Sequence, residues 1–104
     1  MKPGEVRWYR FARPDKGGGS RFSCAIRPLQ FLGEVTIAPI TWTIRGIPTE
    51  VVLFPADGVL PGTCAVNLDH VQTVSKTKLG AALTTLDSSK MAEVRAALLF
   101  ALGF

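Results

Sequence analysis

Hydrophobic and polar residues alternate along most of the first 74 positions of the chain. Alternation with a period of two is typical of half-buried β-strands. It predicts strands at residues 4–11, 22–26, 34–42, 49–54 and 63–68. The 34–42 segment is the clearest because β-branched residues dominate it, although Pro39 demands an edge position or a bulge there. An extended stretch at 69–74 and a single helical turn at 75–79 follow.

A loop and a C-terminal helix complete the predicted layout. Residues 12–20 contain a proline and three consecutive glycines, which predicts a flexible loop. Residues 88–102 have helical spacing, with Asp87 or Ser88 as the N-cap and Gly103 as the stop. The face expected to pack on the sheet consists of Met91, Val94, Leu98 and Leu102. Strands followed by one helix predict an α+β fold, a small curled sheet of five or six strands closed by the helix.

Composition narrows the class of protein. Hydrophobic residues make up 47% of the 104 residues and charged residues 19%, which excludes a disordered chain and suits a single domain over residues 1–104. No uncharged run approaches the roughly 20 apolar residues of a membrane helix, and no signal-peptide core follows the first residues. We therefore expect a soluble, cytoplasmic protein with no membrane partner, in which Cys24 and Cys64 stay reduced.

Basic charge is concentrated in the first part of the chain. Residues 1–45 carry eight basic and three acidic groups, a balance of +5, whereas residues 46–104 carry four basic and five acidic groups, a balance of −1. This asymmetry favours a polyanionic partner for the N-terminal half, with a merely solvated basic face as the alternative. The single histidine, His70, excludes a multi-histidine metal site.

Two short stretches carry candidate chemistry. Asp69 and His70 form an acid–base pair in sequence, but neighbouring strand residues point to opposite faces, so a solvated His70 is favoured over a catalytic one. Thr41, Trp42 and Thr43, followed by Arg45, offer hydroxyls, an aromatic plane and a cation that suit phosphate and base binding. Periodicity alone suits Trp42 equally well to the core.

Several segments, taken in order, resemble the MazF/PemK family of toxin endoribonucleases. The similar segments are Gly4-Glu5-Val6-Arg7-Trp8, Val35-Thr36-Ile37-Ala38-Pro39-Ile40-Thr41, Thr49-Glu50-Val51-Val52-Leu53, Cys64 to Val74, Lys78-Leu79-Gly80 with Leu86, and the final helix. They cover about four-fifths of the chain, with His70 where the family usually has glutamine. The resemblance implies an SH3-like barrel with a C-terminal helix, a homodimer and a cognate antitoxin. It also implies metal-independent cleavage of single-stranded RNA, in which the RNA's 2′-hydroxyl attacks phosphorus and no cofactor takes part.

The resemblance also implies site residues. An arginine and a threonine serve the cleavage step, and their positions here are Arg21 and Thr41. The groups expected to contact RNA are Arg7, Arg13, Lys16, Thr43, Arg45 and His70. Residues 17–30 depart from the family pattern, and an ungapped alignment places a glycine at the position of the arginine. The alternatives are a relative that binds antitoxin or RNA without cleaving, and an SH3-like interaction module that shares only the barrel.

Overall fold

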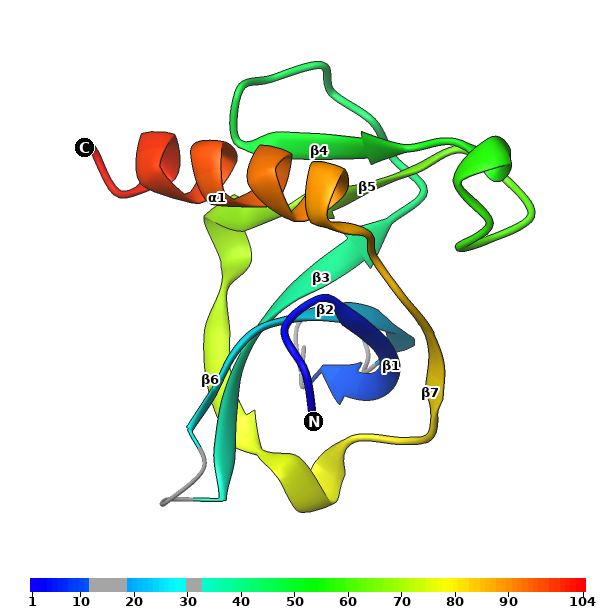
Figure 1. The fold of residues 1–104 in the computed structure, drawn as a ribbon, viewed down its shortest axis with the longest axis vertical. Helices are drawn as coiled ribbons and strands as arrows, with labels where there is room; N and C mark the ends of the chain where they lie inside the picture. The colour runs from blue at the N-terminus through cyan, green and yellow to red at the C-terminus, as the bar shows by residue number, and fades with distance from the viewer. Residues whose placement is uncertain (12–18, 30–32) are drawn as a thin grey trace.

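A strongly curled antiparallel sheet with one helix packed across it forms the fold (Figure 1). The computed structural model describes residues 1–11, 19–29 and 33–104, with the backbone alone at residues 10, 11, 19–21, 28 and 29. The strands described are β1 (Glu5–Phe11), β2 (Gly19–Leu29), β3 (Glu34–Thr41), β4 (Glu50–Leu53), β5 (Cys64–Asn67), β6 (Gln72–Ser75) and β7 (Ala82–Thr85). The helix is α1 (Ser88–Ala101), and short 3-10 turns span Pro55–Asp57, Leu68–His70 and Lys76–Lys78. The predicted α+β class is confirmed, with seven described strands instead of five or six.

The long strand β3 organises the sheet. The strand order is β4-β5-β3-β2-β1-β7, and β6 also pairs with β3. On one side, β3 pairs with β6 up to Ile37 and with β5 from Ile40 onward. Pro39 lies between these two pairings, where the ladder on that side changes partner. This proline therefore sits in the central strand instead of at an edge, and the nearby irregularity is in β2, between Ala25 and Arg27.

Both faces of β3 are buried. One face contributes Ala38 and Ile40 to a core cluster that also contains Val94 and Ala97 of α1. The other face contributes Val35 and Ile37 to a second cluster, which Tyr9 and Leu79 cover. Because α1 closes only the first cluster, the curl of the sheet itself must enclose the second.

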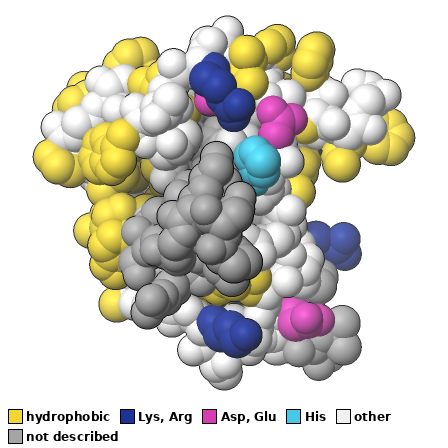
Figure 2. All heavy atoms as spheres, turned by 180° about the vertical axis from the view of Figure 1, so that it is seen from behind, with side chains coloured by type: hydrophobic (Ala, Val, Ile, Leu, Met, Phe, Trp, Pro, Cys, Tyr) yellow, Lys and Arg dark blue, Asp and Glu magenta, His cyan; other side chains and the backbone are white. Residues whose placement is uncertain are grey.

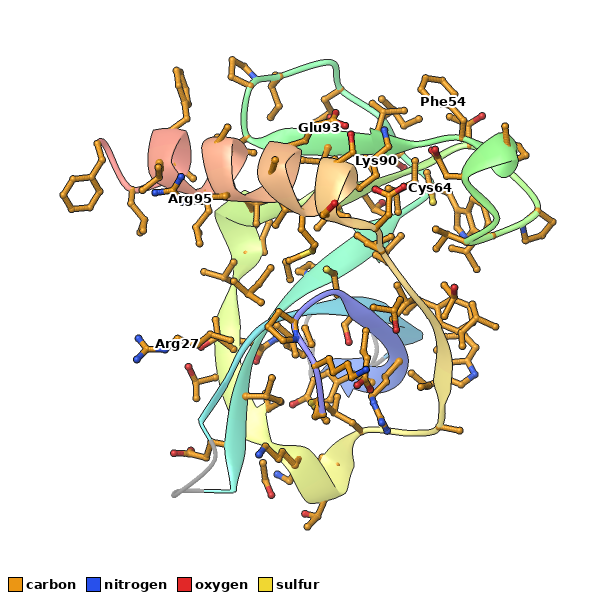
Figure 3. The ribbon with its side chains drawn as sticks, in the orientation of Figure 1. Arg27, Phe54, Cys64, Lys90, Glu93 and Arg95 are labelled. Carbon is orange, nitrogen blue, oxygen red and sulfur yellow. The ribbon has the colours of Figure 1, made fainter. Side chains whose placement is uncertain are left out.

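Lys90 fastens α1 to the sheet. Its ammonium donates a hydrogen bond to the Val52 carbonyl in β4 at 3.1 Å and lies 3.3 Å from Glu93 and 3.8 Å from Asp57. It also stands 5.8 Å from the centre of the Phe54 ring. Figure 3 labels both side chains. Asp87 caps the helix by accepting from the Lys90 amide at 2.8 Å, and Gly103 ends it with φ of +85°, as the sequence predicts.

Four local predictions were wrong. The strand predicted at 22–26 is the much longer β2, which begins at Gly19 inside the predicted loop. It begins there because the ladder with β1 extends as far as the pair of Phe11 with Gly19. Strand β7 was missed, since its mostly exposed residues show no alternation. Asp69 and His70 lie in a 3-10 turn instead of an extended segment, because the Asn67 side chain accepts from the Asp69 amide. Leu102 is 59% exposed, because at the C-cap it lies outside the last turns that contact the core.

Candidate nucleic-acid interface

A pocket of about 310 Å³ opens beside the end of β3. Its walls come from three strands and the segments that follow β3, and they consist of Trp8, Phe22, Ile40, Thr41, Trp42, Thr43 and Leu60. Trp8 and Phe22 face each other across the β1–β2 ladder, and their rings stack with centroids 4.1 Å apart and an interplanar angle of 9°. The pocket therefore combines aromatic surfaces with two threonine hydroxyls.

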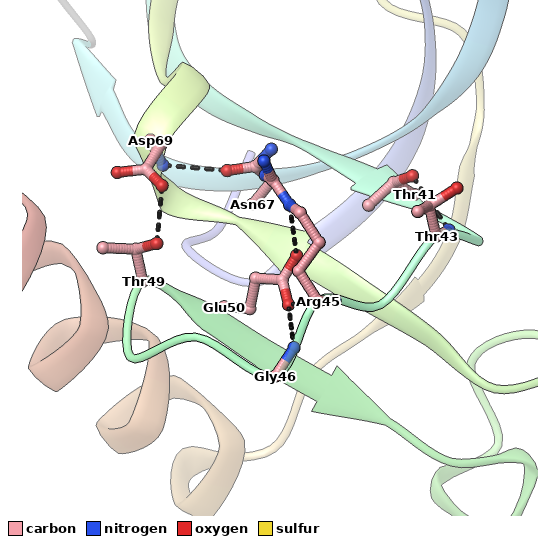
Figure 4. A network of polar contacts seen from close by, with 8 residues as sticks. All are labelled: Thr41, Thr43, Arg45, Gly46, Thr49, Glu50, Asn67 and Asp69. Atoms are coloured by element: carbon pink, nitrogen blue, oxygen red, sulfur yellow. Dashed lines mark hydrogen bonds and ion pairs between the residues drawn. The ribbon is translucent and has the colours of Figure 1, made fainter.

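Thr41 occupies the last position of β3 at the rim of this pocket. Its Oγ1 accepts a hydrogen bond from the Thr43 amide at 3.1 Å, which turns the chain out of the strand (Figure 4). A hydroxyl carries one proton to donate in addition to its acceptor lone pairs. The Thr41 proton therefore remains available to a ligand, while the amide fixes where the oxygen lies.

Glu50 shapes the loop that follows. One of its carboxylate oxygens accepts from the backbone amides of Arg45 and Gly46 at 2.9 and 3.1 Å, and the other lies 3.4 Å from Nε of Arg45. The Glu50 side chain is 1% exposed, whereas that of Arg45 is 50% exposed. The buried carboxylate thus holds the loop while Arg45 keeps half of its surface in solvent.

A second polar cluster lies next to this loop. The Thr49 hydroxyl donates to the Asp69 carboxylate at 2.6 Å, and the Asp69 amide donates to Oδ1 of Asn67 at 3.0 Å. These bonds fix the 3-10 turn that carries the exposed His70. Figure 2 shows the histidine on one face of the molecule beside acidic and basic side chains. His70 is therefore presented to solvent by the turn that this second cluster fixes.

Arg7 has a different environment from the other predicted RNA contacts. Its guanidinium binds the Glu5 carboxylate at 2.7 and 2.8 Å and donates to the Gly80 carbonyl at 2.9 Å. These contacts tie β1 to the segment that precedes β7. The hydrogen bond from the Lys2 amide, followed by the Arg7 guanidinium, holds the pKa of Glu5 below its usual value. The guanidinium is therefore engaged within the fold.

Arg21 lies on β2, and its backbone is opposite Tyr9 in β1. Its side chain lies outside the described part of the structure. The β2–β3 ladder ends at the pair of Ser23 with Pro39, two residues from Arg21 on one strand and two residues from Thr41 on the other. The other two predicted contacts, Arg13 and Lys16, also lie outside the described residues.

The structure groups some predicted site residues and adds others that the sequence did not indicate. Thr41, Thr43 and Arg45 lie together along the chain that leaves β3. Trp42 is 60% exposed, which settles its position outside the core. Sequence reasoning missed Trp8 and Phe22 as walls of the pocket and Glu50 as the anchor of the loop. Trp8 and Phe22 could be recognised as walls of the pocket only from the pairing of their strands. Glu50, five residues after Arg45, was a weak sequence signal for an ion pair within the loop.

The chain also contains two thiols outside this region. Cys24 and Cys64 are both buried and free. Burial raises the pKa of the Cys24 thiol to about 12 and that of the Cys64 thiol in the same direction. Among the described residues, no three His, Cys, Asp or Glu side chains are grouped in a way that could hold a metal ion.

Solved structures of MazF toxins share this fold. The chain superposes on a MazE–MazF crystal structure from Deinococcus radiodurans with a TM-score of 0.79, at 28% identity, over 100% of this chain and 97% of that chain. It also resembles an endoribonuclease in complex with its cognate antitoxin from a mycobacterial species, with a TM-score of 0.75 and 28% identity over 99% and 97% of the two chains. Residues 2–102 match the PemK-like, MazF-like toxins of type II toxin–antitoxin systems, and the chain belongs to this family.

Curated relatives come from Mycobacterium tuberculosis. The chain is 42% identical to a probable endoribonuclease, MazF5, over 67 residues, which are 64% of this chain and 62% of the relative. It is 37% identical to the endoribonuclease MazF4 over 70 residues, 67% of this chain and 64% of the relative. The chain thus spans less than two thirds of the length of these relatives. Within the described residues, no helix has the length and apolar character that a membrane span requires.

Proposed function

We propose that this chain is the endoribonuclease toxin of a type II toxin–antitoxin system and that it cleaves single-stranded RNA without a metal ion. The observation that carries the proposal is the Thr41 hydroxyl at the mouth of an aromatic pocket, in a chain of the MazF-like toxin family. The two relatives named above are described as a probable endoribonuclease and an endoribonuclease, which supports this activity.

In the proposed reaction the RNA supplies its own nucleophile. The 2′-hydroxyl oxygen bonds to the adjacent phosphorus and releases its proton to solvent, while the bond from phosphorus to the 5′-oxygen breaks and that oxygen takes up a proton from solvent. The products are a 2′,3′-cyclic phosphate and a 5′-hydroxyl. No metal or cofactor is needed for this balance, and the protein contributes donors aimed at the charge that develops on the phosphorane.

Arg21 and Thr41 are the proposed catalytic residues. The guanidinium of Arg21 matches the spread negative charge of the phosphorane and donates to the leaving oxygen. The hydroxyl of Thr41 donates a hydrogen bond to a non-bridging oxygen of the phosphorane. The β2–β3 ladder supports this pairing, because its last pair, Ser23 with Pro39, lies two residues from each of the two positions.

Further RNA contacts surround this centre. We propose that Thr43, Arg45 and His70 bind the RNA strand. We propose that Arg13 and Lys16, which are not among the described residues, add contacts to its phosphates. Arg7 enters the proposal with less support, because its guanidinium already bonds to Glu5 and Gly80. Binding carried by such contacts must weaken as salt increases, because each phosphate contact releases a counterion.

We also propose a homodimer, a single domain over residues 1–104, and a cognate antitoxin as the protein partner. The solved MazE–MazF structure and the mycobacterial complex with its cognate antitoxin support the antitoxin. Exposed Leu99, Phe100 and Leu102 at the end of α1 leave apolar surface that a second copy would cover. Sedimentation of the purified chain at micromolar concentration tests the dimer, and a stable monomer would contradict it.

The decisive experiment is incubation with a mixed single-stranded RNA in the presence and absence of EDTA. We expect cleavage in both, with cyclic-phosphate and 5′-hydroxyl ends. An all-deoxy strand of the same sequence must stay intact, because it lacks the nucleophile. Cleavage of that strand would overturn the transesterification route. Absence of RNA cleavage together with tight antitoxin binding would select a binding-only relative.

A further inference from the structure

The chain contains only two tryptophans, Trp8 and Trp42, and both line the pocket beside Thr41. Their side chains are exposed, 46% for Trp8 and 60% for Trp42. Large aromatic side chains that are grouped in contact with solvent mark binding surfaces, because burying them against a ligand lowers the free energy. Two exposed indoles in one pocket therefore point to a ligand with flat aromatic surfaces.

A glycine lies against each tryptophan: Gly62 against the ring of Trp42, and Gly80 against Cβ and the backbone of Trp8. A Cβ on Gly62 would come to 3.0 Å from the Trp42 ring, so this ring lies directly on the glycine. A Cβ on Gly80 would come to 3.1 Å from Cβ of Trp8, and the Gly80 amide donates to the Trp8 carbonyl at 2.9 Å. Trp8 is further fixed by its stack on Phe22. The rings are thus positioned before any ligand arrives, which lowers the entropic cost of binding.

We propose that this pocket is a subsite that holds one nucleobase of the RNA next to the phosphate cleaved at Thr41. The inference rests on the proposed ribonuclease function and adds where and how a base is bound. Every base has an aromatic face that can stack on an indole, and the exposed Thr43 hydroxyl can bond to a base edge. The pocket volume of about 310 Å³ lies at the lower end of the range of ligand pockets, which suits a single base.

Charge favours a nucleotide over other flat ligands. None of the described residues that line the pocket carries a carboxylate, and the net charge of the chain is +4. Arg45, three residues after Trp42, is half exposed on the loop that Glu50 holds. A base stacked in the pocket therefore places its phosphate close to Thr41, where none of the described lining residues repels it.

Intrinsic tryptophan emission tests the subsite directly, because both tryptophans of the chain line it. We would titrate the protein with a mixed-sequence RNA in which every ribose is 2′-O-methylated, so that it binds without being cleaved. Fluorescence polarisation of the labelled RNA reports binding independently. We expect emission to be quenched in parallel with the rise in polarisation. Inorganic polyphosphate, which carries the charge but no base, should leave emission unchanged.

Variants separate the subsite from general binding. Trp42→Ala should weaken RNA binding by about 5- to 150-fold, the range that loss of one stacked base predicts. Phe54→Ala, which removes another exposed aromatic ring outside the pocket, should bind as the parent does. Trp8→Phe keeps an aromatic ring to stack on Phe22. It replaces Trp8→Ala as the test of the Trp8 wall if the alanine variant does not fold.

The outcomes distinguish the subsite from the function on which it rests. RNA that binds and is cleaved without quenching tryptophan, or that binds equally well to Trp42→Ala, would overturn the subsite and leave the ribonuclease standing. Equal quenching by polyphosphate would also overturn it. A chain that neither raises polarisation nor cleaves unmodified RNA would remove the proposed function, and the subsite with it.

Discussion

The ring of Trp42 lies on Gly62 so closely that the glycine has no room for a side chain beneath it. Gly62→Ala must therefore shift the indole from the position in which it rests on the glycine, and the exposed outer side of the ring leaves room for that shift. We expect the free energy of unfolding to change by less than about 0.5 kcal/mol, as for other surface substitutions. Acrylamide quenching of tryptophan emission, measured in a Trp8→Phe background where Trp42 is the sole tryptophan, should change. Identical quenching with and without the alanine would contradict this packing.

Thr41→Val should slow RNA cleavage by about 10²- to 10³-fold, because it removes the hydroxyl that we propose as a donor to the transition state. Thr41→Ser keeps the hydroxyl and should retain most of the activity. Thr36→Val is the matched control on the same strand, since the Thr36 hydroxyl bonds only to that of Thr73 among the described contacts, at 3.1 Å. Initial cleavage rates on one RNA provide the comparison. Equal losses in Thr36→Val and Thr41→Val would indicate damage to β3 instead of chemistry.

Arg21→Ala should abolish cleavage if Arg21 occupies the position of the catalytic arginine in the toxin family, which requires a gap in the alignment within residues 17–30. Arg27→Ala makes the same change of charge on the same strand, and Arg27 is exposed and directed away from the sheet (Figure 3). Comparing the two variants separates catalysis from the general loss of one positive charge. Unchanged cleavage in Arg21→Ala would transfer the role to another group, with His70 the next candidate.

Glu50→Ala should lower the free energy of unfolding by about 1–3 kcal/mol, because two backbone amides and Nε of Arg45 lose their acceptor. Glu93→Ala removes an exposed carboxylate that pairs with Lys90 and should cost less than about 1 kcal/mol. Urea unfolding of both variants measures the difference. Equal stabilities of the two would show that the loop does not depend on Glu50.

Stability should fall in acid partly through Glu5. The Lys2 amide, and after it Arg7, lower the pKa of this carboxyl in the folded chain, so the unfolded chain takes up the proton at a higher pH. The contribution is therefore complete above the usual glutamate pKa of about 4.3 and is lost as pH falls through the lower folded value. Glu5→Gln should flatten the dependence of stability on pH in that window. An unchanged slope would contradict the role of Glu5.

Local sequence signals predicted the elements whose patterns are complete within one segment. The β-branched run before Trp42 predicted β3 to within one residue, and Asp87 and Gly103 predicted both ends of α1. The ordered segments that resemble the toxin family pointed to the fold before any strand pairing was known. Leu102 shows the limit of this reasoning, because helical periodicity says which residues share a face but not where the core beneath that face ends.

Which residues line the pocket became known only from the tertiary structure. Trp8, Phe22 and Trp42 are far apart in sequence, and they meet only because β1 pairs with β2 in one register and the sheet curls back past the end of β3. Periodicity within a strand assigns a side chain to a face, whereas the distance between two faces depends on register and curvature. The sequence therefore determined the strands that have a complete local pattern, above all β3, together with the helix and the candidate chemistry of Thr41. The aromatic walls around that hydroxyl, and the buried carboxylate that shapes the loop beside it, depend on contacts between segments that no local pattern encodes.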